Sequence, residues 1–135
     1  MKIEDFLHKR FQALMTEDYA TVFASYHEQA PFRQQFASCE DYLDFARRHL
    51  AQVKVLNWQF LRQRDAAVGQ VECLLSMELE VGTVRQPYYE LALLIQDRSG
   101  WRYHSAQKLT AEDFSGSSGE IDFRHFDDAS PKIRF

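Results

Sequence analysis

The residues best suited to metal chemistry in this sequence are its five histidines, and their spacing argues against a metal site. His27 and Glu28 begin the zinc-binding pattern H-E-x-x-H, but Pro31 occupies the position of the second histidine. The sequence also contains no glycine loop that could cradle a phosphate and no nucleophile elbow. It therefore predicts no metal and no cofactor. The remaining histidines, which show no ligand spacing within a helix, are His8, His49, His104 and His125.

Two residues are weak candidates for acid–base catalysis. His27 follows Tyr26 at the end of a predicted helix, where the helix dipole favours the imidazolium form and suits proton donation to a bound carbonyl group. The alternative is that His27 only caps the last carbonyl groups of that helix. Glu90 lies on a predicted strand whose expected register turns it away from the helices, and a slip of one residue would bring it to their side.

The first half of the sequence predicts three helices. Apolar residues recur at helical spacing over residues 3–15, and a second, shorter helix is expected after Thr16, its predicted N-cap, and to end near His27. Ser38, with Asp41 three residues later, resembles a capping box that opens a third helix through Leu50.

The apolar pattern changes from the helical to the strand period after Ala51. In the clearest strand, residues 71–81, every odd position is apolar and most even positions are polar. Gly82-Thr83 predicts a turn into a strand at 88–95, and residues 97–100 lead to a last strand at 101–108. This order predicts an α+β fold, with three N-terminal helices packed on a curved antiparallel sheet.

The expected register assumes three-residue hairpin loops or bulges. It leaves the far face of the sheet half apolar, which is unusual for a solvated face and predicts a homodimer through that face. His104 on this face is expected to pair with Glu72. The expected cross-strand pairs are Met77 with Tyr89, Leu75 with Leu91, and Ile95 with Tyr103. The predicted interface residues are Leu74, Ala92, Leu94, His104 and Ala106.

Short stretches of the sequence resemble the middle domain of bacterial SEC-C-motif proteins, in the nuclear transport factor 2-like superfamily. The resemblance implies a cone with a pocket between the helices and the concave sheet. It carries no metal site, because the flanking cysteine-rich motifs are absent. Enzymes of the superfamily use a carboxylate near the position of Gln34, which cannot abstract a proton. The matching stretches are Arg10-Phe11-x-Ala13, Asp18-Tyr19, Ser25-Tyr26-His27, Gly69-x-Val71-Glu72-Cys73, Glu90 and Gly100-Trp101-Arg102-Tyr103.

A pocket of that kind would be lined by aromatic walls and a few polar tips, as small-molecule sites usually are. For each residue alone, packing in the core is the competing interpretation. The predicted ligand-binding residues are Tyr26, His27, Trp58, Tyr89, Tyr103 and Gln107.

The C-terminal part of the chain has a different composition. We expect one domain over residues 1–114, followed by a linker and arm over residues 115–135, because residues 115–119 read Ser-Gly-Ser-Ser-Gly. The arm is expected to dock on its own domain through Ile121, Phe123 and Phe126, and the alternative is that it captures a partner.

Composition limits the function. A net charge of -4 without a basic run argues against nucleic acid, and the absence of an apolar stretch of about 20 residues argues against a membrane span. With Cys39 and Cys73 as isolated thiols, we expect a cytoplasmic protein. The predicted function is binding of a small hydrophobic molecule, and the alternatives are a cofactor-free lyase or isomerase and a protein-interaction adaptor.

Overall fold

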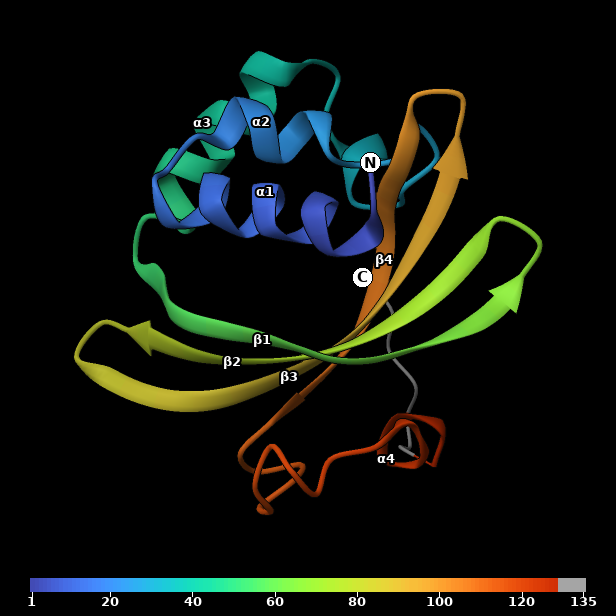
Figure 1. The fold of residues 1–135 in the computed structure, drawn as a ribbon. Helices are drawn as coiled ribbons and strands as arrows, with labels where there is room; N and C mark the ends of the chain where they lie inside the picture. Colours follow the sequence, from blue (N-terminus) through green and yellow to red (C-terminus); the bar gives the residue numbers. More distant parts are fainter. Residues whose placement is uncertain (129–135) are drawn as a thin grey trace.

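The computed structural model describes residues 1–128 and has an α+β fold in which helices precede a curved antiparallel sheet (Figure 1). The helical part contains α1 (Ile3–Met15), α2 (Tyr19–Ala24), the 3-10 helix η1 (Arg33–Gln35) and α3 (Cys39–His49). The sheet contains β1 (Val53–Ala67), β2 (Gln70–Val81), β3 (Val84–Asp97) and β4 (Gly100–Thr110), and α4 (Phe123–Asp127) follows it.

The helix starts follow from their capping residues. The Asp18 side chain accepts a hydrogen bond from the Thr21 N–H at 3.3 Å and begins α2, so the prediction of Thr16 as the N-cap is wrong. The predicted Ser38 cap of α3 is confirmed, because Ser38 Oγ accepts from the Asp41 N–H at 3.2 Å. Helix α2 ends at Ala24 rather than near His27, because the backbone after it pairs with β4.

The four strands lie in sequence order, β1-β2-β3-β4, and every neighbouring pair is antiparallel. The expected register between β2 and β3 is wrong by one residue: Met77 lies opposite Tyr88, and Leu75 lies opposite Glu90. The cause is the turn, because Gly82 adopts a left-handed φ of 64° and a two-residue loop joins Val81 to Val84.

A bulge in the next pairing changes the face of one more residue. The β3–β4 register shifts between Leu93 and Leu94, so that Tyr103 lies opposite Leu94 and not opposite Ile95 as expected. The shift turns the Tyr103 side chain toward the helices. The backbone N–H of Tyr103 donates to the Ser25 carbonyl oxygen at 2.9 Å. A parallel bridge between Tyr26 and Tyr103 thus joins the end of α2 to the sheet at β4.

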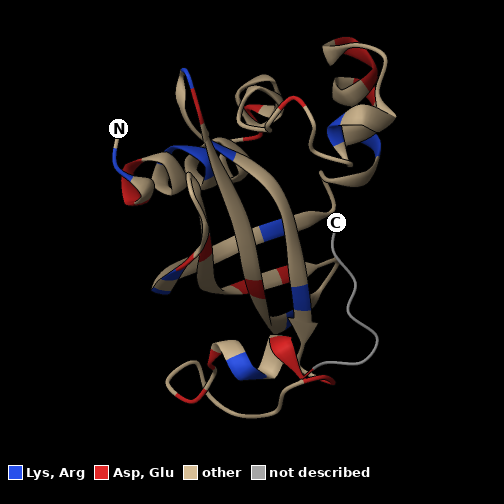
Figure 2. Ribbon diagram, turned by 90° about the vertical axis from the view of Figure 1, so that its right-hand side faces the viewer, with Lys and Arg blue, Asp and Glu red and all other residues tan. Residues whose placement is uncertain are grey.

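The two faces of the sheet carry separate hydrophobic clusters. One face packs against α1, α2 and α3, and the other is covered by the C-terminal arm with α4 (Figures 1 and 2). In the arm, Ile121 and Phe126 are completely buried and Phe123 packs beside them, as the sequence predicted. Figure 2 also shows basic and acidic residues interspersed over the helices and the arm. No helix within residues 1–128 is long and apolar enough to span a membrane.

Candidate functional site

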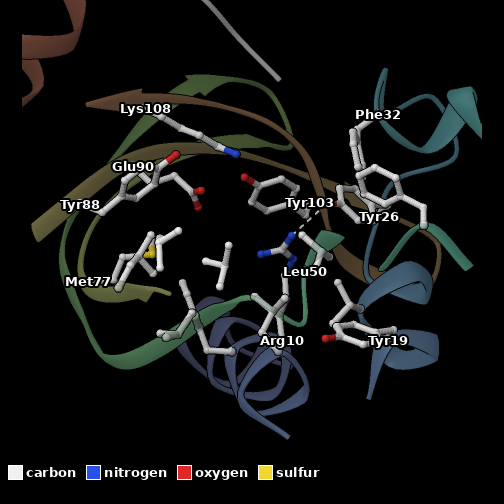
Figure 3. A pocket seen from close by; sticks show the side chains of 18 of the residues that line it. Arg10, Tyr19, Tyr26, Phe32, Leu50, Met77, Tyr88, Glu90, Tyr103 and Lys108 are labelled. Carbon is white, nitrogen blue, oxygen red and sulfur yellow. Dashed lines mark hydrogen bonds between the residues drawn. The ribbon is translucent and has the colours of Figure 1, made fainter. Parts of the chain in front are cut away.

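The main cavity lies between the helices and the helix-facing side of the sheet and has a volume of about 490 Å³ (Figure 3). Most of its wall is apolar or aromatic, and its polar groups are few. Helix α1 contributes Arg10, β3 contributes Tyr88 and Glu90, and β4 contributes Tyr103 and Lys108. Cavities of roughly 300–1,000 Å³ with such a lining commonly hold small molecules.

Arg10 is a buried cation in this wall, with 6% of its surface exposed. Its Nε donates to Ser25 Oγ at 3.1 Å and its Nη2 to the Tyr26 hydroxyl at 3.3 Å, and both partners are neutral. The guanidinium also lies 3.8 Å from the centre of the Tyr103 ring. Burial by itself lowers the pKa of Arg10, but the nearby Tyr26, Tyr103 and Glu90 outweigh burial and raise that pKa. Arg10 therefore stays charged beside the cavity.

Glu90 is the buried anion of the same wall and is also 6% exposed. Its Oε2 has no hydrogen-bond partner among residues 1–128. Figure 3 shows the Glu90 carboxylate, the Tyr103 hydroxyl and the Lys108 ammonium group approaching one another, and Lys108 is the cross-strand neighbour of Glu90. Burial first, and then the charge of Glu90, raise the pKa of Tyr88 and of Tyr103. The Glu90 carboxylate thus adds to the effect of burial on both phenols at this end of the cavity.

The structure brings only two of the predicted ligand-binding residues, Tyr26 and Tyr103, to the cavity wall. Trp58 stacks on Phe11 with ring centres 4.4 Å apart, within the core. Gln107 lies opposite Leu91 on the side of the sheet that the arm covers.

The two other candidates also lie away from the cavity wall. The Tyr89 hydroxyl donates to the Gly116 carbonyl oxygen at 3.3 Å, on the arm side of the sheet. His27 accepts the Gln29 N–H on Nδ1 at 3.1 Å, in the turn after α2.

The residues predicted for a dimer interface do not share one face. Ala92, Leu94 and Ala106 belong to the cluster beneath the helices, and Leu74 belongs to the cluster beneath the arm. His104 Nδ1 lies 2.9 Å from Ser105 Oγ. The prediction of a single half-apolar face is wrong because the β2–β3 register differs by one residue from the expected one. The difference divides these residues between the two sides of the sheet.

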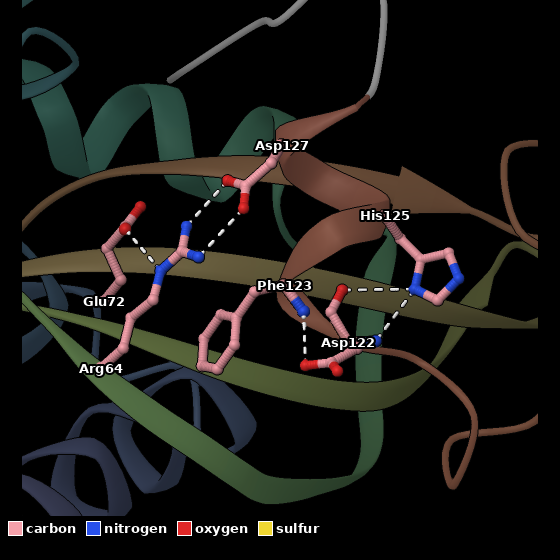
Figure 4. Close-up of polar contacts among 6 residues, drawn as sticks. All are labelled: Arg64, Glu72, Asp122, Phe123, His125 and Asp127. Atoms are coloured by element: carbon pink, nitrogen blue, oxygen red, sulfur yellow. Dashed lines mark hydrogen bonds and ion pairs between the residues drawn. The ribbon is translucent and has the colours of Figure 1, made fainter.

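A second polar cluster fastens the arm to the sheet (Figure 4). Arg64 of β1 donates from Nη1 and Nη2 to the two carboxylate oxygens of Asp127, at 3.0 and 2.7 Å, and from Nε to Glu72 Oε1 at 3.0 Å. Its guanidinium also lies 4.5 Å from the centre of the Phe123 ring. The contact with Asp127 is bidentate, and together with the bond to Glu72 it links α4 to two strands and positions the arm.

Sequence reasoning missed Arg10 and Lys108, and it gave the inward orientation of Glu90 only as the alternative register. The available signal was the dipeptide Gly82-Thr83, because a two-residue turn places the even residues of β3, including Glu90, on the helix side. Arg10 gave a weaker signal, as a charged residue within an otherwise apolar helical stripe.

The fold and the cavity together define an α+β domain with a ligand-sized pocket that contains one buried cation and one buried anion. No protein-family model matches the chain, and no curated protein matches it. Within the described residues, no cluster of three or more His, Cys, Asp or Glu side chains could hold a metal ion.

Proposed function

We propose that this domain binds a small, largely apolar molecule in the cavity between its helices and its sheet. The observation that carries the proposal is a 490 Å³ cavity whose aromatic and aliphatic lining is interrupted by a few polar groups. The order of the elements and the curved sheet also support membership of the nuclear transport factor 2-like superfamily, whose cone holds a pocket at this place.

A thermal-shift screen against a metabolite library tests this function, because a ligand present at a hundred times its Kd stabilises a protein by about 2.7 kcal/mol. A matched pair of variants shows whether a hit occupies the cavity. Val55 lines the cavity, whereas Val68 at the β1–β2 turn is fully exposed. Val55→Trp should fill the space and abolish the shift, while Val68→Trp should retain it. A shift that survives in Val55→Trp would place the ligand elsewhere and contradict the proposal.

The inward orientation of Glu90 supports a second candidate function, a cofactor-free lyase or isomerase. Such enzymes need a base within a water-poor cavity, and Glu90 is a buried carboxylate on the cavity wall. Tyr103 beside it has a hydroxyl group that suits hydrogen bonding to a substrate carbonyl. His27, the other candidate base, does not line this cavity.

Deuterium incorporation distinguishes the enzyme from the binder. A ligand found in the screen is incubated with the protein in deuterated water, and its carbon-bound hydrogens are followed by mass spectrometry. An enzyme of this kind should exchange a hydrogen, and Glu90→Gln should slow the exchange at least about a hundredfold. A ligand that binds and neither exchanges a hydrogen nor isomerises would support the binding function and contradict proton abstraction by Glu90 from that ligand.

A further inference from the structure

The unpartnered oxygen of Glu90 restricts which molecules the cavity can accept. Oε2 is buried and belongs to a residue that lines the cavity. No donor among residues 1–128 meets the distance and angle of a hydrogen bond to Oε2, although an interaction of hydrogen-bond type with Glu90 adds to the raised pKa of the Tyr103 phenol. Buried polar atoms in proteins are almost always hydrogen-bonded, and a donor group on a molecule in the cavity can supply the missing partner of Oε2. A ligand without a donor group would leave this carboxylate oxygen unpaired.

The surrounding charges restrict the ligand further. A cationic head group at Glu90 would meet Lys108, its cross-strand neighbour, and Arg10 across the cavity. An anionic head group would be repelled by Glu90 and would leave Oε2 without a donor. A neutral donor is repelled by none of these groups and forms a hydrogen bond with an ionised acceptor, which is stronger than a neutral one.

We propose that the cavity selects a neutral, largely apolar molecule that donates a hydrogen bond from an O–H or N–H group to the Glu90 carboxylate. This inference rests on the proposed binding function and adds the chemical class of the ligand. Arg10 has a different role in it: its hydrogen bonds to Ser25 and Tyr26 and its stacking on Tyr103 hold the wall in place.

Three naphthalene probes of nearly equal size test the proposal. They are 2-naphthol, which donates a hydrogen bond, 2-methoxynaphthalene, which cannot, and 2-naphthoate, which is anionic. Their Kd values are measured by ligand-observed NMR on the full chain near neutral pH. We expect 2-naphthol to bind at least about tenfold more tightly than 2-methoxynaphthalene, because the methoxy compound leaves a buried charged acceptor unpaired. We expect 2-naphthoate to bind more weakly than 2-naphthol.

A variant pair assigns the preference to Glu90. Glu90→Gln keeps the shape of the side chain but replaces one acceptor with a donor, so the preference for naphthol over its methyl ether should fall below about threefold. The control is Glu78→Gln on β2, where Glu78 is part-exposed and accepts a hydrogen bond from Asn57, and there the preference should persist. If Glu90→Gln does not fold, the ratio of the wild-type affinities for 2-naphthol and 2-methoxynaphthalene still tests the selection of a neutral donor.

The possible outcomes distinguish a failure of the neutral-donor selection from a failure of the proposed binding function. Equal binding of naphthol and methoxynaphthalene, or tighter binding of naphthoate, would overturn the selection of a neutral donor and leave the binding function intact. A preference for naphthol that Glu90→Gln does not reduce would overturn the role of Glu90. Failure of all three probes to bind the wild-type chain, together with an empty metabolite screen, would overturn both proposals.

Discussion

Two residues of the cavity wall, Glu90 and Tyr42, each keep one buried polar atom without a hydrogen-bond partner among residues 1–128. The physical consequences of the two atoms differ. The carboxylate oxygen belongs to a charged group that interacts with Arg10, so its removal also removes a favourable electrostatic contact. The Tyr42 hydroxyl is neutral, and its ring packs between Phe36 and Phe23. This hydroxyl can therefore be deleted without loss of packing.

We expect Tyr42→Phe to raise the free energy of unfolding by about 1 kcal/mol, because it removes a buried hydroxyl group that no hydrogen bond compensates. Chemical denaturation of both proteins measures the difference. Tyr89→Phe is the matched control, since the Tyr89 hydroxyl donates to the Gly116 carbonyl oxygen and its loss should lower that free energy by about 1 kcal/mol. A destabilised Tyr42→Phe protein would show that its hydroxyl has a partner in solution.

The two thiols should differ in reactivity. Cys73 is completely buried, and burial, with the charge of Glu72 as a smaller cause, raises the pKa of its thiol to about 12. At pH 8 only about 1 in 10,000 Cys73 side chains would be thiolates, and the thiolate is the reactive form. Cys39 at the start of α3 is partly exposed. Iodoacetamide should therefore label Cys39 alone in the native protein and both thiols in urea, as mass spectrometry would show. Labelling of native Cys73 would contradict the packing of β2.

At the scale of the elements, the sequence predicts where strands lie better than it predicts how they pair. The alternation over residues 71–81 correctly indicates that the odd residues of β2 share a face. The register between β2 and β3 depends on one backbone angle, the φ of 64° at Gly82. Apolar residues on both faces of β3 fit either register. The bulge after Leu93 leaves no clear signal in the sequence. The sequence therefore did not determine on which face of the sheet Glu90 lies, because that face depends on the strand register.

The docking of the arm gives a test at this scale. Phe126 of α4 is completely buried, whereas Phe123 in the same helix is partly exposed. We expect Phe126→Ala to lower the free energy of unfolding by about 3 kcal/mol, as Phe→Ala substitutions in a core do, and Phe123→Ala to lower it by about 1 kcal/mol. Denaturant titration of the two variants measures both values. Equal, small effects would mean that the arm does not form part of the cooperative fold.

At the scale of the whole molecule, one sheet serves two purposes because each face is covered by a different part of the chain. The helices leave a cavity over one face, and the arm covers a compact cluster on the other. Apolar residues on both sides of the strands do not reveal what covers the second face, since a second copy and the chain's own arm satisfy the same pattern. The homodimer stays a prediction, and the arm now accounts for the burial of Leu74 within one chain.

The concentration of phenols around the cavity predicts a loss of stability in alkaline solution. Burial raises the pKa of Tyr42, Tyr88 and Tyr103 above the ordinary value of 10.0. The unfolded chain therefore releases these protons at a lower pH than the folded protein. By linkage, their contribution to the free energy of unfolding is complete below pH 10 and is lost as the pH rises above it.

Tyr88→Phe isolates one of these contributions, because it removes a titrating hydroxyl and keeps the ring. Between pH 8 and pH 11 the wild type should lose up to about 1.4 kcal/mol more of its free energy of unfolding than the variant, as one buried phenol requires. Denaturant titrations at both pH values measure the difference, and absorbance at alkaline pH shows whether phenol ionisation coincides with unfolding. Equal losses in the two proteins would mean that Tyr88 ionises freely in the folded state, and the wall of the cavity would then be open to water at that residue.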